Sequence, residues 1–323
     1  MELDDKVLNR RTYDRDAVEK IAEGYRTWGR WGPDDELGAG NHVTPERIAA
    51  AAALVRSGRV FSMALPLDVN GPMFARNTRV NPQHVMLVTP HDQLMPEGSK
   101  QAFSDDAVYM PLQCSTQWDA LCHLLYDGKA YNDRDLDSVN NVQGAVYNSI
   151  TNIKTRAIGR GVLLDIPRFL GRDWLETGEA IQGEDLERCA DKQGVEVGEG
   201  DFVLVRTGQL AQRRASGDWG DYAGGPAPGL GVSAADFLCP RNVVAVATDT
   251  WGIEALPYEA PEIMAPLHII LLVNAGIYIG EMWDMEALAE DCAADGVYEF
   301  FLTAPPLTIT GAVGSPLNPL AIK

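Results

Sequence analysis

The residues most able to do chemistry in this 323-residue chain lie together between positions 113 and 123. If the segment is an extended strand, its side chains alternate between two faces. One face then carries two carboxamides, a hydroxyl, a carboxylate and an imidazole, from Gln113, Ser115, Gln117, Asp119 and His123. The segment is therefore either a strand with a solvated polar face or a place where polar groups meet a substrate, a water molecule or a metal ion.

The spacing of these polar groups limits which of them can act together. Neighbours on one face of a strand are about 6.6 to 7 Å apart, so Gln117 and Asp119 could bind one ion. Gln113 and His123 are too far apart for this unless the chain bends. A bend is consistent with the sequence, because Asp119 can cap the first turn of a helix that places His123 one turn later.

A second imidazole and carboxylate occur in the segment from Pro266 to Glu281. Pro266 and Gly276 predict the two ends of a short helix, which rises about 12 Å over residues 268–275. The strand that follows returns by about 13 to 16 Å and brings Glu281 back to the level of His268. A hairpin with its turn at 274–276 gives the same proximity. Such a pair is by itself more often a structural hydrogen bond than a catalytic site.

Composition narrows the class of protein. Hydrophobic residues make up 46% and charged residues 23%, as in ordinary globular proteins. The net charge of −19 argues against nucleic-acid binding, which needs a basic surface.

The five cysteines are scattered without a CxxC pair, which indicates a reducing compartment. The N-terminus lacks the apolar core of a signal peptide, and the longest apolar run is far short of the ~20 residues of a membrane span. We expect a soluble, cytoplasmic protein.

The order of patterns along the chain predicts an α/β fold with one principal domain. Residues 1–57 read as a peripheral, helical N-terminal extension, with a capping box at Asp16 to Glu19 and a helix capped by Thr44. From residue 58 to residue 323, short strands alternate with helices, which is typical of an α/β core. The buried strands are expected at 161–166, 200–205 and 243–248.

Taken together, these segments resemble the cyclase and kynurenine-formamidase-like family of metal-dependent amide hydrolases, which includes isatin hydrolases. The family motif His-x-Gly-Thr-His-x-Asp-x-Pro-x-His corresponds to residues 113–123, and the later His and Glu of the family correspond to His268 and Glu281. The resemblance covers about residues 58–323. It implies the swivelling β/β/α core of that family, a homo-oligomer (dimer or tetramer), and sites that can borrow residues from a neighbouring subunit.

The chain departs from the family motif at its metal ligands. Glutamines stand at positions 113 and 117, where the family has ligating histidines. The resemblance still assigns Asp119, His268 and Glu281 as metal ligands and His123 as the catalytic imidazole. With carboxamide oxygens of Gln113 and Gln117 in place of imidazoles, the site suits Mn²⁺ better than Zn²⁺, and Mg²⁺ or Ca²⁺ also fit such oxygen-rich ligation. A site without metal is the alternative.

Three functions fit these residues. The first is hydrolysis of a small, cyclic or open amide by a metal-activated water, with His123 as general acid and base. The second is metal-free acid–base chemistry (ring opening, dehydration or isomerisation), with Gln113 and Gln117 as donors to an oxyanion. The third is a non-catalytic ligand-binding protein. A Cys122–His123 hydrolase is disfavoured, since adjacent strand residues point to opposite faces.

Contacts to a small-molecule substrate are expected from an apolar wall of Trp118, Tyr126 and Trp251. Arg76 and Arg79 form a close pair of arginines, which is a candidate anion contact or a solvated loop. The loop at 222–230 should also influence specificity. The sequence does not identify the substrate.

Overall fold

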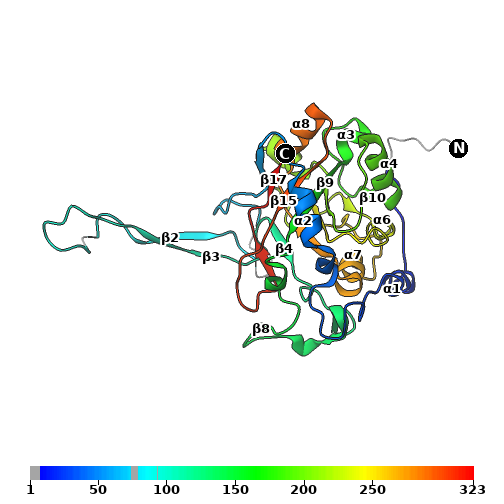
Figure 1. The fold of residues 1–323 in the computed structure, drawn as a ribbon, viewed down its shortest axis with the longest axis horizontal. Helices are drawn as coiled ribbons and strands as arrows, with labels where there is room; N and C mark the ends of the chain where they lie inside the picture. Colours follow the sequence, from blue (N-terminus) through cyan, green and yellow to red (C-terminus); the bar gives the residue numbers. More distant parts are fainter. Residues whose placement is uncertain (1–7, 74–78, 93) are drawn as a thin grey trace.

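A nine-stranded sheet forms the centre of the molecule (Figure 1). The computed structural model describes residues 8–73, 79–92 and 94–323. Along the sheet the strands are ordered β1 (Val60–Ser62), β17 (Leu320–Ile322), β15 (Glu299–Thr303), β9 (Ile158–Asp165), β11 (Phe202–Arg206), β13 (Ala245–Thr248), β14 (Tyr278–Glu281), β4 (Gln117–Asp119) and β16 (Gly314–Pro316). The predicted α/β fold is confirmed.

The middle of the sheet is parallel and its two sides are antiparallel. Strands β9, β11, β13 and β14 run in one direction, whereas β15 and β4 pair with them in the other. Every residue of β11 and β13 is buried, as expected for strands that are covered on both faces. The strands predicted at 161–166, 200–205 and 243–248 correspond to these three central strands, with ends shifted by a few residues.

Helices and short turns connect the strands. The helices are α1 (Arg15–Gly24), α2 (Pro45–Ala52), α3 (Ile166–Leu170), α4 (Gly183–Gln193), α5 (Gln209–Ser216), α6 (Ala234–Leu238), α7 (Pro266–His268), a π-helix (Ile269–Ala275) and α8 (Glu286–Asp295). Four 3₁₀ turns span Gly38–His42, Tyr131–Asp133, Leu136–Ser138 and Ile150–Ile153. Three small two-stranded sheets pair β5 (Lys129–Ala130) with β6 (Arg134–Asp135), β7 (Val139–Asn140) with β8 (Gly144–Ala145), and β10 (Ala180–Ile181) with β12 (Gly229–Leu230).

The N-cap residues of α1 and α2 can be compared with those predicted from the sequence. The Thr44 hydroxyl accepts a hydrogen bond from the Arg47 amide and begins α2, as predicted. The cap of α1 is Asp14 rather than Asp16, because the extended backbone of Asp14 lets its carboxylate accept from the Ala17 amide at 2.8 Å. The predicted capping box at Asp16 is therefore wrong by two residues.

The N-terminal helices pack into the main core. Val18 and Ala22 of α1, together with Val43 before α2, belong to the same hydrophobic cluster as the central strands. Helix α1 lies against the π-helix, and α2 lies against β9 and β15. Residues 8–57, expected to be peripheral, thus share a hydrophobic core with the rest of the described chain.

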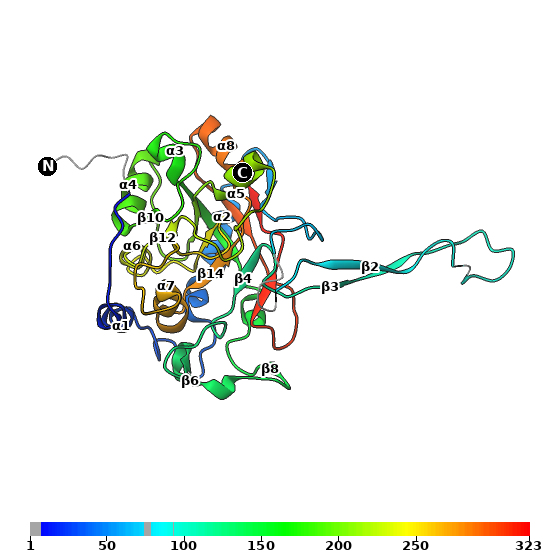
Figure 2. The same cartoon turned by 180° about the vertical axis from the view of Figure 1, so that it is seen from behind.

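A long hairpin projects from the body of the molecule (Figures 1 and 2). Its strands are β2 (Gln83–Val88) and β3 (Asp105–Tyr109), which pair antiparallel and leave most of their side chains exposed. Arg79 lies near the base of this hairpin, whereas Arg76 lies outside the described residues. Among the described residues, no helix is long and apolar enough to cross a membrane.

Candidate metal and catalytic site

The topology of the sheet places three polar side chains on one face near its carboxyl edge. Parallel strands end at the same edge, and Glu281 is the last residue of β14. Antiparallel pairing sets Gln117 of β4 opposite Glu281 and Asp119 opposite Ile279. Since residues two apart on a strand share a face, Gln117, Asp119 and Glu281 lie on the same side of the sheet.

Trp118 lies on the opposite face of β4 and in the core. Its indole N–H donates to the Ala304 carbonyl at 2.8 Å, and its ring packs 4.6 Å from that of Trp283. Gly280 makes room for it, because a Cβ there would lie 2.7 Å from the Trp118 ring. The expected substrate contact at Trp118 is thus replaced by a packing role, for the reason that adjacent strand residues point to opposite faces.

His268 reaches the same face from the last position of α7. Its Nδ1 lies 2.7 Å from Glu254 Oε1, and the same carboxylate oxygen accepts from the His268 backbone N–H at 3.0 Å. This carboxylate fixes the ring so that Nε2 points 3.4 Å from Glu281 Oε1. The proximity of His268 and Glu281 predicted from the segment length is confirmed, although the helix between them is a π-helix over Ile269–Ala275.

The three residues form a buried group with the composition of a metal site. One ligand atom from each of Asp119, His268 and Glu281 lies within 4.8 Å of the others, and all three residues are buried. Gln117 adjoins the group, since its Nε2 donates to Glu281 Oε2 at 2.6 Å. Three of the five predicted ligands are thereby brought together, with Gln117 beside them.

His123 enters the site through a turn rather than through a helix. The chain leaves β4 after Asp119 and bends so that the His123 amide donates to the Ala120 carbonyl at 2.9 Å. This bend brings His123 Nε2 to 3.6 Å from Asp119 Oδ1. The predicted bend is confirmed, but the helix after Asp119 is wrong, because a tight turn already closes the distance.

Burial and neighbouring charges control protonation in the site. Burial and the charge of Glu281 raise the pKa of Asp119 well above its ordinary value. Burial lowers the pKa of His123 to about 4, so its imidazole is neutral near pH 7. For His268, burial is outweighed by hydrogen bonds to Glu254 and Glu281, which raise its pKa to about 10.

Several buried polar atoms of the site have no hydrogen-bond partner. Both carboxylate oxygens of Asp119 and the Oε1 atom of Gln117 are buried without a hydrogen-bond partner. Buried acceptors of this kind are costly unless a partner satisfies them. A divalent cation held by Asp119, Glu281, His268 and Gln117 would satisfy them, so the residues present fit a metal ion. Gln113 fits less well, because its buried unpaired atom is the Nε2 donor and not a ligating oxygen.

The raised pKa of His268 predicts a pH dependence of metal binding. Below a pKa of about 10 the ring carries a proton that must leave before Nε2 can bind an ion. Each proton displaced makes the apparent affinity rise about tenfold per pH unit between pH 6 and 9. Calorimetric titration of Mn²⁺ in buffers of different ionisation enthalpy should therefore show one to two protons released per ion. Binding that is independent of pH would contradict this arrangement.

The two other residues predicted to contact substrate, Tyr126 and Trp251, lie in different surroundings. The Tyr126 hydroxyl bonds with Glu19 and Arg15 at the surface beside α1, so the structure gives it no contact with the buried group. Trp251 packs against a hydrophobic cluster that includes Met282, the residue that follows Glu281. Sequence reasoning missed Glu254, which lies in no motif and meets His268 only in the folded chain.

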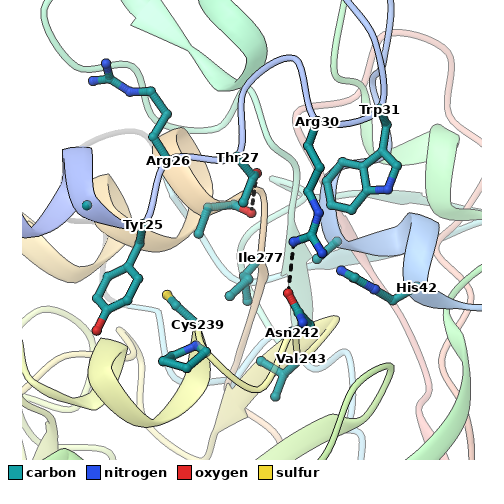
Figure 3. A pocket seen from close by; sticks show the side chains of 14 residues that line it. Tyr25, Arg26, Thr27, Arg30, Trp31, His42, Cys239, Asn242, Val243 and Ile277 are labelled. Atoms are coloured by element: carbon teal, nitrogen blue, oxygen red, sulfur yellow. Dashed lines mark hydrogen bonds between the residues drawn. The ribbon is translucent and has the colours of Figure 1, made fainter.

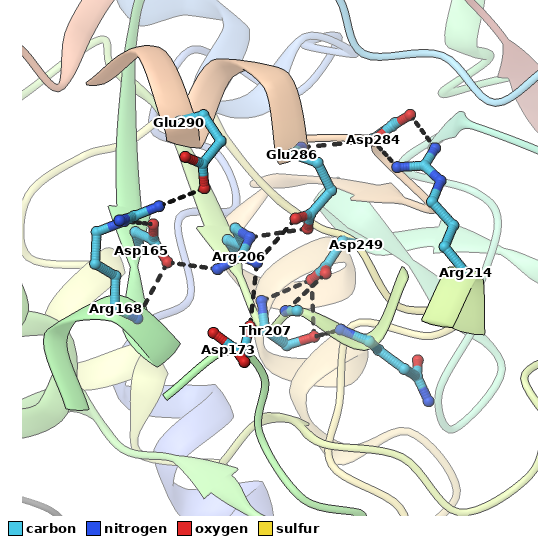
Figure 4. A network of polar contacts seen from close by, with 12 residues as sticks. Asp165, Arg168, Asp173, Arg206, Thr207, Arg214, Asp249, Asp284, Glu286 and Glu290 are labelled. Carbon is cyan, nitrogen blue, oxygen red and sulfur yellow. Dashed lines mark hydrogen bonds and ion pairs between the residues drawn. The ribbon is translucent and has the colours of Figure 1, made fainter. Parts of the chain in front are cut away.

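An ion-pair network braces the carboxyl edge beside the site (Figure 4). Arg206, at the end of β11, pairs with Asp165 at 2.9 Å and with Glu286 at 2.8 Å. The Asp249 carboxylate accepts from the Thr207 amide and hydroxyl and from the Gly208 amide, at 2.7 to 2.8 Å. These bonds fix the start of the loop that carries Trp251 and Glu254.

A separate cavity of about 270 Å³ opens at the other edge of the sheet (Figure 3). It is lined by residues that precede β13 and β14, including Val243 and Ile277, and by Arg30 and His42 from the N-terminal segment. Arg30 donates to Asn242 Oδ1 at 2.9 Å across it. Because Glu281 ends β14 at the carboxyl edge, this cavity is distinct from the buried polar group.

Solved structures with the same fold include a novel cyclase and several isatin hydrolases. The cyclase is 42% identical, with a TM-score of 0.85 over 94% of this chain and 99% of that one. Isatin hydrolase A from Labrenzia aggregata is 22% identical, with a TM-score of 0.59 over 81% and 93% of the two chains. The enzyme from Ralstonia solanacearum is 21% identical, with a TM-score of 0.58 over 86% and 97%.

A comparison with protein-family models agrees with the structural one. No curated protein matches the chain. The Cyclase family model matches residues 39–255, which is most of the chain and includes Gln117, Asp119 and His123. Together with the 42% identity to a solved cyclase, this match establishes that the chain belongs to the cyclase family.

Proposed function

We propose that this chain hydrolyses the C–N bond of a small amide, cyclic amides included, with a divalent metal ion and His123. The observation that carries the proposal is the buried group of Asp119, His268 and Glu281, whose ligand atoms lie within 4.8 Å of one another. The unpaired oxygens of Asp119 support an ion at this position. The fold shared with isatin hydrolases supports the class of reaction.

The residues divide the chemistry between them. The ion would supply a water molecule of lowered pKa and polarise the amide carbonyl. Glu254 keeps the His268 ring oriented through its Nδ1, and Gln117 holds the Glu281 carboxylate. His123, neutral near pH 7, accepts a proton from the attacking water and delivers it to the leaving nitrogen. An open amide gives a carboxylic acid and an amine, and a cyclic amide gives one molecule that carries both groups.

The donor set favours a hard or borderline ion. Asp119, Glu281 and Gln117 offer oxygen atoms, and His268 offers the single nitrogen of the group. Oxygen-rich ligation suits Mn²⁺ or Mg²⁺, whereas Zn²⁺ prefers nitrogen and sulfur ligands. Manganese, which accepts one imidazole among oxygens, is therefore the ion of this proposal.

A metal-free enzyme is the second candidate, and one observation favours it. Gln113 Nε2 is a buried donor without a partner and could bind a developing oxyanion. The matching role for Gln117 is weakened, because its Nε2 already donates to Glu281. A purely ligand-binding protein is a third candidate, but it gives no reason to keep Asp119, Glu281 and His268 buried together at the cost of their desolvation.

Metal removal tests the proposal against both alternatives. The protein is purified without added metal, analysed for bound ions, and then assayed on isatin and formanilide before and after treatment with a chelator. We expect about one equivalent of a divalent ion after dialysis against Mn²⁺, with hydrolysis lost on chelation and restored by Mn²⁺. Hydrolysis that persists in ion-free protein would favour the metal-free mechanism.

We also propose that this chain associates with further copies of itself through the projecting hairpin. Val85, Leu87, Val108 and Tyr109 are all at least half exposed on β2 and β3. An isolated two-stranded hairpin is marginally stable in water and gains from a partner that covers its apolar residues. The occupant is a second copy of this chain, in a dimer or tetramer.

Light scattering coupled to gel filtration measures the assembly. Leu87→Asp with Tyr109→Asp should convert the oligomer to a monomer, because buried carboxylates oppose the contact. The matched control is Leu136→Asp with Val142→Asp, which changes two exposed apolar residues outside the hairpin. A wild-type protein that is monomeric at micromolar concentration would refute the assembly.

We also propose that the protein is located in the cytoplasm. All five cysteines are free thiols, which is usual in a reducing compartment. The proposed reaction acts on a small molecule and involves neither a nucleic acid nor a membrane. Fractionation of cells that express the native gene tests this, and recovery in a secreted fraction would contradict it.

A further inference from the structure

Two buried hydrogen-bond donors beside the metal group have no partner. They are Trp251 Nε1 and Gln113 Nε2. Neither can bind a metal ion, since both are N–H donors. An unsatisfied buried donor costs free energy unless a ligand supplies an acceptor, so these two atoms need an explanation other than the metal.

Both donors border the group of ligands. Trp251 packs against the hydrophobic cluster that contains Cys114 and Met282, which adjoin Gln113 and Glu281 in the sequence. Gln113 Nε2 lies 2.6 Å from the position of a Cβ on Gly314, and Gly314 pairs with Asp119 in the sheet. Gln113 Nε2 therefore lies beside the residue paired with Asp119, and Trp251 packs beside the residues that adjoin Gln113 and Glu281.

A positive charge accompanies these donors. The Arg79 guanidinium carbon lies 5.5 Å from the centre of the Trp251 ring. Its charge opposes the rise that burial causes in the pKa of Asp119, which places Arg79 within electrostatic reach of that carboxylate. Among the described residues no carboxylate forms an ion pair with Arg79, whereas Arg160 and Arg206 each pair with two.

The site thus has one half made of acceptors and one half made of donors. The unpaired oxygens of Asp119 and Gln117 can bind a metal cation. The guanidinium of Arg79 and the N–H groups of Trp251 and Gln113 can bind an anion. A protein with net charge −19 repels anions over most of its surface, so a local arginine is needed to hold one. Arginine is also the side chain best suited to a carboxylate, through paired hydrogen bonds.

We propose that the substrate carries a carboxylate group in addition to its amide, and that Arg79 binds this carboxylate with help from the N–H groups of Trp251 and Gln113. The inference rests on the proposed hydrolase, and it adds the class of substrate: a small anionic amide. Arg79 is then a specificity residue that acts on substrate binding and leaves the water and the proton transfer to other residues.

Binding of unreactive probes tests this independently of hydrolysis. Benzoate and benzamide have the same size and differ in charge, and their affinities are measured by calorimetry on the Mn²⁺-loaded wild-type protein and on Arg79→Gln. We expect Arg79→Gln to weaken benzoate by about 10- to 100-fold and benzamide by less than about threefold. Benzoate affinity that is unchanged in Arg79→Gln overturns the proposal, because the anion would then be held by the metal ion.

Two further variants separate charge from folding. Trp251→Phe keeps the ring and removes its N–H, and it should weaken benzoate several-fold. Arg134→Gln is the matched control, since Arg134 also stacks on an aromatic ring, that of Tyr147 at 4.3 Å, and should leave both affinities unchanged. If Arg79→Gln does not fold, Arg79→Lys takes its place, and wild-type affinity for benzoate in Trp251→Phe would also count against the proposal.

Hydrolysis of matched substrates shows whether Arg79 binds a carboxylate that the substrate already carries or the carboxylate that hydrolysis forms. Formanilide and the three formamidobenzoates share one scissile bond and differ by a carboxylate. A rise in KM of Arg79→Gln confined to the formamidobenzoates supports a substrate carboxylate. An equal fall in kcat for all four would assign Arg79 to the carboxylate formed in the reaction and overturn the proposed class. Absence of any hydrolysis would refute the hydrolase alone, since the benzoate result does not depend on turnover.

Discussion

Replacing Asp119 by asparagine should abolish metal binding and hydrolysis while leaving the fold intact. Both carboxylate oxygens of Asp119 are buried without a hydrogen-bond partner among the described residues. Loss of an outer partner typically weakens a metal site by about 10- to 100-fold, and loss of a charged ligand should cost more. The ion-free protein should be about as stable as wild type, because asparagine replaces a carboxyl group whose charged form burial and the charge of Glu281 already disfavour.

Calorimetric titration with Mn²⁺ and thermal unfolding with and without the ion measure this effect. Mn²⁺ should raise the unfolding temperature of wild type and leave that of Asp119→Asn unchanged. Asp133→Asn is the control, since it makes the same chemical change at an exposed carboxylate that pairs with Lys129. Full metal affinity in Asp119→Asn would show that the buried group is not the metal site.

Replacing His123 by glutamine should lower kcat by about 10²- to 10⁴-fold with the ion still bound. His123 lies 3.6 Å from Asp119 Oδ1, and its Nδ1 atom has no partner, so the ring is free to transfer a proton. Its low pKa, caused mainly by burial, keeps it in the proton-accepting form near neutral pH. Glutamine retains hydrogen bonding at this position and cannot accept the proton.

The two readouts for His123→Gln are kcat at saturating Mn²⁺ and the stoichiometry of bound ion. His84→Gln is the matched control, because His84 also pairs with an aspartate, Asp106 at 2.7 Å, but on the exposed hairpin. If His123→Gln keeps most of the wild-type kcat, the proton is carried by another group. If it loses the ion, His123 belongs to the metal ligands.

Local patterns determined the parts of the site that depend on short stretches of chain. Strand alternation places Gln117 and Asp119 on one face, and the structure has them so in β4. The lengths of a helix and a returning strand bring His268 to Glu281, which lie 3.4 Å apart. Both inferences succeed because backbone geometry over about 14 residues is fixed by repeat lengths that every helix and strand shares.

Other features depend on contacts between distant parts of the chain. The pairing of β4 with β14 joins residues about 160 positions apart, and hydrophobic alternation does not specify which strand is the neighbour. The same holds for Arg79 beside Trp251 and for Tyr126, whose hydroxyl is taken by Glu19 of α1. Only the packed structure decides such partners, because many polar residues of the sequence could serve equally well.

The sequence by itself determined an α/β core, a carboxylate and an imidazole that meet at one edge of its sheet, and glutamines at positions 113 and 117. Tertiary structure decided what those residues can do. It assigned Trp118 to the core, oriented His268 through Glu254, and left Asp119 without hydrogen-bond partners. The physical reason is that burial and hydrogen-bond satisfaction are properties of a residue's surroundings, which are assembled from several distant segments and cannot be read from any one of them.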